Sequence, residues 1–419
     1  MKKKFVGLDV LRFGLAVYLM MFHTIHDYPQ LKLLPFNELL GMGGVATSSF
    51  FILSGFILAH VYFGNSSDTL RGGARDFLIK RLTNLYPIHI IALVLFVVVV
   101  LGAGGARLDS YSWLSMTDMS DPSTILGPVE LAFNRLLALL MLDTWNPLYI
   151  TLNPPAWSLS VLFFFYICFP WLAPRLLSTP HPRRWLFMTW VVYLIPPAIA
   201  GALALMGPPV AGIVTTNPIM RLPEFMAGIL FYNMYRSGGL RVITDVKGWK
   251  LYALAFCALC FVGEAWLIAH GSAYWLYLVH NGGMLPAELA MLLVAAQSME
   301  NSSVFVTRWS ARLGNAALSI FAVHLSVFFV FIKVQKFYGA GMSPLECLHQ
   351  RGACLAAYKA AEPALGGYPL YLLATVVVAL FFQEVLVVKM RDALRRRFTS
   401  KPVTALANAD AVNPVRARR

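Results

Sequence analysis

Apolar runs long enough to cross a lipid bilayer recur along the whole chain. Each run is roughly 18–24 residues long, close to the length that a hydrocarbon core of about 30 Å requires of a helix. Stretches rich in proline, glycine and charged residues separate them. The pattern predicts an all-α, polytopic membrane protein. The apolar runs cover residues 6–28, 43–63, 83–104, 129–145, 155–174, 185–206, 217–235, 249–270, 274–297, 311–333 and 368–388.

The charges between the runs favour ten spans over eleven. Eleven crossings would put the lysines at positions 2–4 and the basic C-terminal cluster on opposite sides, against the positive-inside rule. The run at 129–145 is the weakest because it is short and carries Arg135 near its middle. We predict that it is re-entrant or interfacial, so that ten helices cross and both termini are cytoplasmic. A transmembrane domain at 1–390 would then precede a basic, disordered cytoplasmic tail at 391–419.

The composition excludes a soluble globular domain. Hydrophobic residues make up 58% of the 419 residues and charged residues 13%, compared with about 45–50% and about 25% in soluble domains. The formal net charge is +14, but lysine and arginine gather in the loops and the tail assigned to the cytoplasm. We therefore expect membrane lipids, and not nucleic acid, as the partners that this composition implies.

Two segments, 105–154 and 334–367, are the long outer loops in this orientation. The second contains Cys347 and Cys354, which an oxidising compartment would allow to form a disulfide. The sequence leaves the bridged and the reduced forms open. Cys257 and Cys260 have CxxC spacing, but their apolar surroundings favour packing over redox or metal chemistry. We expect no metal site.

Arg12 and His23 are ionisable residues inside the first predicted helix, where such side chains are costly. Eleven residues at about 100° each place both on one helix face, about 16.5 Å apart along the axis. Asp27, one turn beyond His23, could orient the imidazole for general-base chemistry. The structural alternative is that Arg12 pairs with Asp9 while His23 bonds to a neighbouring helix.

Other polar residues at predicted helix ends could bind a substrate or serve packing alone. Arg221 and Glu224, three residues apart, can form an ion pair, and Glu224 could also supply a catalytic carboxylate. His324 lies at a depth similar to that of His23, in a different helix. The candidate substrate-binding residues are Ser54, Trp157, Ser158, Ser160, Arg221 and His324.

Six motifs in chain order resemble the acyltransferase 3 family of bacterial membrane O-acyltransferases. They are the spacing of Arg12 and His23, residues 50–56 (FFILSGF), 77–87, 157–161 (WSLSV), 221–228 and 313–324. The resemblance extends from residue 7 to about residue 384. Two positions differ from the family pattern. Leu162 stands where the family usually has glutamate after WSLSV, and Asn84 replaces the second arginine of its RxxR motif.

The resemblance implies acyl transfer from cytoplasmic acyl-CoA, most often acetyl-CoA, at the bacterial inner membrane. The acceptor would be a hydroxyl at the outer face, on exopolysaccharide, lipopolysaccharide O-antigen, periplasmic glucan or another compound. Two further functions stay open. One is a transporter or flippase of a lipid-linked sugar or small anion, and the other is a catalytically inactive scaffold.

Each candidate residue has a role in the acyltransferase hypothesis. His23 would be the catalytic base, with Asp27 or Glu224 supplying the carboxylate that the family places at position 162. Arg12 and a basic cytoplasmic segment would hold the donor's phosphates. The donor-binding candidates are Arg12, Arg71, Arg75 and Arg81.

Overall fold

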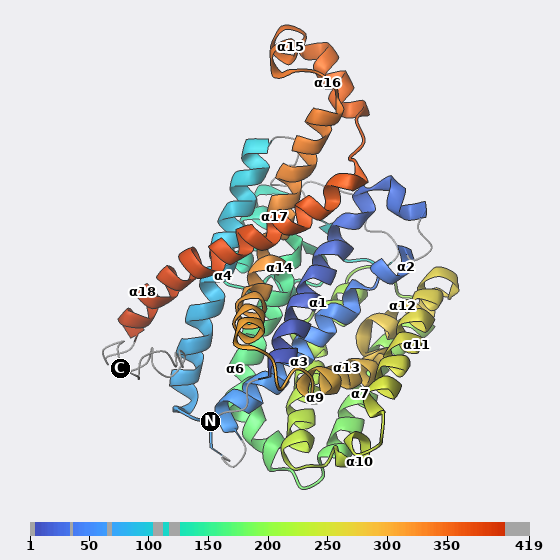
Figure 1. Cartoon of the computed structure of the whole chain (residues 1–419), viewed down its shortest axis with the longest axis vertical. Coiled ribbons are helices and arrows are strands. Elements are labelled where there is room, and N and C mark those ends of the chain that lie inside the picture. The colour runs from blue at the N-terminus through green and yellow to red at the C-terminus, as the bar shows by residue number, and fades with distance from the viewer. Residues whose placement is uncertain (1–4, 34–36, 65–68, 104–111, 117–125, 399–419) are drawn as a thin grey trace.

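Long helices make up almost the whole computed structural model, which describes residues 5–33, 37–64, 69–103, 112–116 and 126–398 (Figure 1). In these ranges, nine helical segments are long and apolar enough to cross a membrane. The prediction of an all-α, polytopic membrane protein is confirmed. The nine segments are Val6–Asp27, Asn37–Phe63, Gly73–Gly102, Pro154–Ser178, Pro182–Ala202, Trp249–His270, Tyr274–Ala296, Val304–Gly339 and Leu365–Phe398.

The described residues contain eighteen α-helices. We call the ten that form the main part of each predicted crossing the long helices, and the other eight the shorter helices. The long helices are α1 (Val6–Thr24), α3 (Gly43–Phe63), α4 (Gly73–Ala103), α6 (Trp157–Ser178), α7 (Pro182–Ala202), α9 (Pro218–Arg236), α11 (Trp249–His270), α13 (Leu285–Ala296), α14 (Val304–Gly339) and α17 (Tyr368–Phe381). The shorter helices are α2 (Asn37–Leu40), α5 (Pro128–Leu139), α8 (Val210–Thr215), α10 (Arg241–Thr244), α12 (Ala273–Leu278), α15 (Pro344–His349), α16 (Arg351–Ala360) and α18 (Val388–Phe398). Strands β1 (Ser112–Trp113) and β2 (Tyr149–Ile150) form one antiparallel pair.

The tenth predicted span, 217–235, forms α9. This helix has 19 residues but carries Arg221, Glu224 and Arg236, so it is less apolar than the nine candidates. It packs in the centre of the bundle against α3, α6 and α7, where protein partners replace lipid around its charges. The segment 129–145 forms the 12-residue helix α5, which is too short to cross, as its length and its arginine predicted.

The start of α1 and the end of α18 lie on the same side of the bundle, opposite α15 and α16 (Figure 1). This arrangement fits an even number of crossings. The predicted domain boundary at residue 390 falls inside α18, which runs to Phe398. Residues 391–398 are helical because a π-helical turn at Phe382–Val387 continues α17 into α18, and α18 packs against α4. The rest of the predicted tail, 399–419, lies outside the described residues.

Helices α3 and α9 pack closely because each places a glycine against the other's backbone. A Cβ on Gly55 would overlap the carbonyl of Phe225, and a Cβ on Gly228 would overlap the carbonyl of Ile52. Small residues at such crossings allow the backbones of membrane helices to approach. The glycine of the FFILSGF motif therefore has a packing role in this structure.

We expect Gly55→Val to lower the stability of the folded protein by about 1–3 kcal/mol, because an isopropyl group must enter a filled helix crossing. The measurement is the thermal unfolding midpoint of the purified protein in detergent. Gly263→Val on α11 is the matched control, since a Cβ at Gly263 meets no atom within 4 Å. Equal midpoints for the two variants would contradict the prediction.

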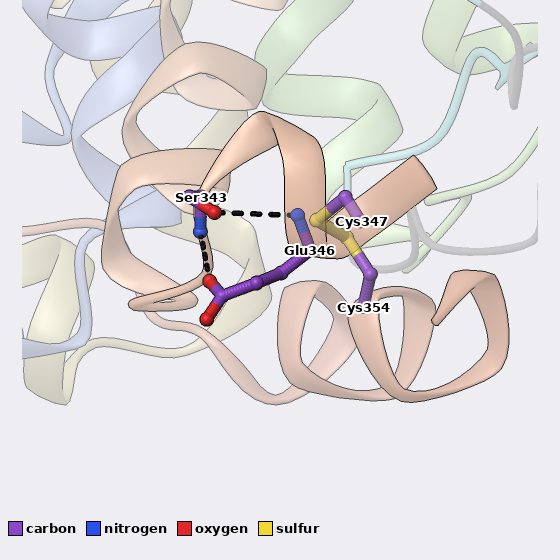
Figure 2. The surroundings of a disulfide bond; sticks show 4 residues. All are labelled: Ser343, Glu346, Cys347 and Cys354. Atoms are coloured by element: carbon purple, nitrogen blue, oxygen red, sulfur yellow. Dashed lines mark hydrogen bonds between the residues drawn. A yellow bond between two sulfur atoms is a disulfide. The ribbon is translucent and has the colours of Figure 1, made fainter. Parts of the chain in front are cut away.

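The chain between α14 and α17 folds into a disulfide-linked helical hairpin made of α15 and α16 (Figure 2). Cys347 and Cys354 are bonded with an S–S distance of 1.99 Å, so the structure contains the bridged form of the two that the sequence left open. At the start of α15, Ser343 N donates to Glu346 Oε2 over 2.7 Å, and Glu346 N donates to Ser343 Oγ over 3.2 Å. This reciprocal pair is a capping box.

The capping box depends on pH through Glu346. The hydrogen bond from the Ser343 backbone N–H lowers the pKa of the Glu346 carboxyl below its ordinary value. Because the folded-state pKa is lowered, the cap is fully formed above glutamate's ordinary pKa and is lost as pH falls through the lowered value.

Removing the bridge should loosen the hairpin and leave the membrane bundle unchanged. The bonded cysteines are separated by 7 positions, and closing so short a loop is worth about 2–3 kcal/mol on a chain-entropy estimate. In limited proteolysis, we expect the Cys347→Ser/Cys354→Ser variant to be cleaved within the hairpin faster than the wild type. Its thermal unfolding midpoint should equal that of the wild type. Reductant should accelerate cleavage of the wild type and have no further effect on the variant. Equal cleavage of both proteins in the absence of reductant would contradict this.

Candidate active site

Helices α1 and α14 bring His23 and His324 into contact. His23 Nδ1 lies 3.1 Å from His324 Nε2. The rings stack with centroids 5.0 Å apart and an interplanar angle of 25°. His324 is fully buried, whereas His23 is half-buried. Two predicted site residues from opposite ends of the chain therefore form one pair, at the outer end of α1 in the predicted orientation.

Hydrogen bonding selects the tautomer of each neutral imidazole. His324 Nδ1 lies 2.7 Å from the carbonyl oxygen of Phe321. A carbonyl only accepts, so His324 Nδ1 carries a proton and donates it. His324 Nε2 is then an acceptor, and the proton shared within the pair sits on His23 Nδ1. His23 Nε2 keeps its lone pair, which is what a general base requires.

The predicted pairing of Asp27 with His23 was wrong. Helix α1 ends at Thr24, and the chain tightens into a 3-10 turn at Ile25–Asp27. The prediction assumed about 100° of rotation per residue, whereas a 3-10 turn advances by about 120° and rotates Asp27 off the face of His23. Asp27 is exposed. His324, and not a carboxylate, is the residue that orients His23 in the described structure.

Arg12 lies on the same face of α1 as His23, as their spacing predicted. Its Nη1 lies 3.4 Å from the carbonyl oxygen of Gly314 on α14, the helix that also carries His324. The same nitrogen lies 3.8 Å from Asp9 Oδ1, so the ion pair of the structural alternative is also present. The Arg12 side chain keeps 22% of its surface exposed.

A basic cavity of about 630 Å³ lies among α4, α14, α18 and the segment before α4. Its lining contains six cationic side chains and two carboxylates. The cations are Arg71, Lys80, Arg81, Arg312, Arg391 and Arg395, and the carboxylates are Asp76 and Glu384. Arg71 and Arg81 were predicted to bind a donor, and they do share one cavity. Arg75 is exposed and lies outside the lining. Guanidinium groups in this number suit a ligand with several phosphates.

Tyr166 lies near both Arg12 and Arg81, and Arg81 is part of the cavity lining. The Arg81 guanidinium lies 4.9 Å from the centre of the Tyr62 ring, and Arg81 Nε is buried with no hydrogen-bond partner among the described residues. Tyr166 is close to both Arg81 and Arg12, and its hydroxyl is hydrogen-bonded to Ser54. Three predicted site residues therefore surround a tyrosine that no motif marked.

Comparison with known proteins identifies the family. The family described as "Acyltransferase domain" matches residues 5–384. The chain belongs to the acyltransferase 3 family. It is similar to Acyltransferase MdmB of Streptomyces mycarofaciens, with 25% identity over 309 residues, 68% of each chain. It is also similar to Protein 2 in picA locus of Rhizobium radiobacter, with 34% identity over 122 residues, 27% of this chain and 58% of the relative. No solved structure matches.

In this membrane acyltransferase the WSLSV segment begins α6, and its side chains make local contacts. The Ser160 hydroxyl donates to Asp143 Oδ1, and Ser158 Oγ lies 3.4 Å from a carbonyl three residues back. The Trp157 ring packs edge-on against Phe51 with centroids 6.1 Å apart. These contacts hold the start of α6, and substrate binding by the three residues stays a prediction.

Arg221 and Glu224 form an ion pair at the centre of the acyltransferase bundle, 3.1 Å apart and fully buried. Arg221 also donates to Tyr193 Oη over 2.9 Å, to Asn281 Oδ1 over 2.7 Å and to Ser48 Oγ over 2.8 Å. The Tyr193 hydroxyl donates to Glu224 Oε1 over 2.7 Å. The predicted ion pair is confirmed, and the Glu224 carboxylate belongs to this network and not to the histidine pair.

The two departures from the family pattern have different surroundings. Leu162 is 4% exposed and packs in the main apolar core. Its side chain therefore supplies no carboxylate at the position where the family usually has glutamate. Asn84 lines the basic cavity, where Arg312, Arg391 and Arg395 supply cations from other helices. The sequence marked these three arginines as cytoplasmic charges only. Their gathering in one cavity depends on how distant helices pack.

Proposed function

We propose that this acyltransferase moves an acyl group from cytoplasmic acyl-CoA to a hydroxyl of a cell-surface or exported glycan. The acyl group that we propose is acetyl. Transfer would take place at the outer face of the bacterial inner membrane. The observation that carries the proposal is the His23–His324 pair, whose hydrogen bonds leave a lone pair on His23 Nε2. Family membership supports acyl transfer, and the basic cavity supports a donor with several phosphates.

The proposed reaction is one direct acyl transfer. His23 Nε2 removes the proton of the acceptor hydroxyl while the hydroxyl oxygen attacks the thioester carbonyl carbon. The carbon–sulfur bond then breaks, the new carbon–oxygen bond remains as an ester, and the thiolate leaves. The proton on Nε2 passes to the sulfur and produces free coenzyme A. Throughout, the bond from His23 Nδ1 to His324 holds the ring in place and stabilises the imidazolium that forms transiently.

The test is transfer of radiolabelled acetyl from acetyl-CoA by the purified wild type in lipid nanodiscs. Crude exopolysaccharide, lipopolysaccharide and periplasmic glucan serve as separate acceptors. We expect label in one glycan fraction, with one free thiol released per acetyl transferred, and neither product when donor or acceptor is omitted. Movement of a lipid-linked glycan across vesicles without acyl-CoA would favour the transporter. Failure of folded wild type with acetyl-CoA and longer acyl donors would favour the inactive scaffold.

A further inference from the structure

Helix α18 extends beyond the family match and contributes to the basic cavity. The match ends at residue 384, whereas α18 runs from Val388 to Phe398. Its arginines Arg391 and Arg395 line the cavity together with Val388. Figure 1 shows α18 crossing beside α4, the helix that carries the predicted donor-binding Arg81. The cavity therefore contains two cations that the family pattern does not account for.

Arg395 is fixed against α4 by two hydrogen bonds. Its Nε donates to Thr83 Oγ1 over 3.3 Å, and its Nη2 donates to the carbonyl of Lys80 over 3.4 Å. Arg391 lies one helical turn earlier, with its Nε 3.0 Å from Asp392 Oδ1. Residues four apart lie on the same face of a helix. Both arginines of α18 therefore lie on the face directed at the cavity.

The π-helical turn before α18 adds a carboxylate to the same lining. Glu384 accepts from Arg312 Nε over 2.7 Å and from Arg312 Nη2 over 2.9 Å. Asp76 lies 2.9 Å from Lys80 Nζ. The two carboxylates of the lining are thus engaged with Arg312 and Lys80, while four further arginines share the cavity. Such a site favours a multiply charged anion, because one guanidinium group can donate two parallel hydrogen bonds to two phosphate oxygens.

We propose that α18 completes the donor site, with Arg391 and Arg395 binding the phosphates at the nucleotide end of acyl-CoA together with Arg71 and Arg81. This inference rests on the proposed function, because it assigns the same donor to the cavity. A volume of about 630 Å³ lies within the range of small-molecule sites. In this proposal the cavity holds the phosphates of acyl-CoA. The thioester end of acyl-CoA extends past Arg12 and Tyr166 towards His23.

Direct binding of coenzyme A, measured by calorimetry in phosphatidylcholine nanodiscs, tests this without requiring turnover. We compare Arg391→Gln/Arg395→Gln with Arg396→Gln/Arg397→Gln, which removes the same charge from the same helix. The control arginines are exposed and lie outside the lining. Losing two charge-assisted contacts should raise the Kd about 10–100-fold in the cavity variant and less than about twofold in the control. Arg391→Gln alone, which leaves the bonds of Arg395 to α4 intact, should raise it about 3–10-fold.

The outcomes separate this inference from the proposed function. If the wild type binds coenzyme A and both double variants bind equally well, α18 is not part of the donor site, and the proposed donor stands. If the wild type does not bind coenzyme A, both proposals fail. A phosphate group could also come from an anionic lipid. A cavity variant with unchanged coenzyme A affinity that loses thermal stabilisation by phosphatidylglycerol would overturn the inference in favour of a lipid headgroup.

Discussion

Replacing His23 by glutamine is expected to lower acyl transfer by a factor of about 10²–10⁴, the usual contribution of a positioned general base. Glutamine can occupy much of the imidazole's volume and still donate to His324, but it has no basic nitrogen. The measurement is kcat for labelled acetyl transfer to the glycan that the wild type uses. Coenzyme A binding should stay within about twofold of wild type, because His23 does not line the basic cavity.

His324 should act through His23 as a positioning residue. Its Nε2 accepts a hydrogen bond from His23 Nδ1, and its Nδ1 donates one to the carbonyl oxygen of Phe321. We expect His324→Leu to lower kcat about 10–100-fold with little change in KM. His324→Gln, whose side-chain oxygen can still accept from Nδ1, should recover part of that loss. His26→Gln is the control, since His26 is exposed in the 3-10 turn. Wild-type transfer by a folded His23→Gln protein would refute the base assignment.

The shared face of Arg12 and His23 could be predicted because it depends on helix geometry alone. Eleven residues complete slightly more than three whole turns, and both side chains contact α14 in the structure. The partner of His23 could not be predicted in the same way. Its bond to His324 joins positions 301 apart and depends on how two distant helices pack. Periodicity carries no information about that packing.

The errors of sequence interpretation have local causes. A change from α-helix to 3-10 turn after Thr24 moved Asp27 away from His23. Hydropathy ended the last helix near residue 388, because the next residues are basic and resemble a solvated tail. The chain continues as α18 because α4 accepts hydrogen bonds from Arg395. A hydropathy pattern detects burial in lipid, and it does not detect a cationic helix packed against another helix.

The buried network around Arg221 should be the most sensitive point for stability. Arg221 is 0% exposed and contacts Glu224, Tyr193, Asn281 and Ser48. Arg221→Met removes the positive charge and leaves Glu224 unpaired inside the bundle. Breaking a buried pair in this way typically costs about 3–5 kcal/mol, because the remaining charge has lost its partner. We expect a clearly lowered unfolding midpoint in detergent.

The double variant Arg221→Met/Glu224→Gln should recover most of that loss, because neutral residues of similar size replace the whole pair. The exposed pair of Arg312 and Glu384, with side chains 36% and 44% exposed, is the matched control. Arg312→Met should lower the midpoint much less than Arg221→Met, because solvent screens the exposed pair. Equal midpoints for Arg221→Met and Arg312→Met would contradict the prediction.

The Arg221→Met and Arg221→Met/Glu224→Gln variants also separate two roles of Glu224. If its carboxylate takes over the part that the family gives to glutamate at position 162, a stable double variant will not transfer acetyl. If the pair is structural, transfer will follow the folded fraction in both Arg221 variants.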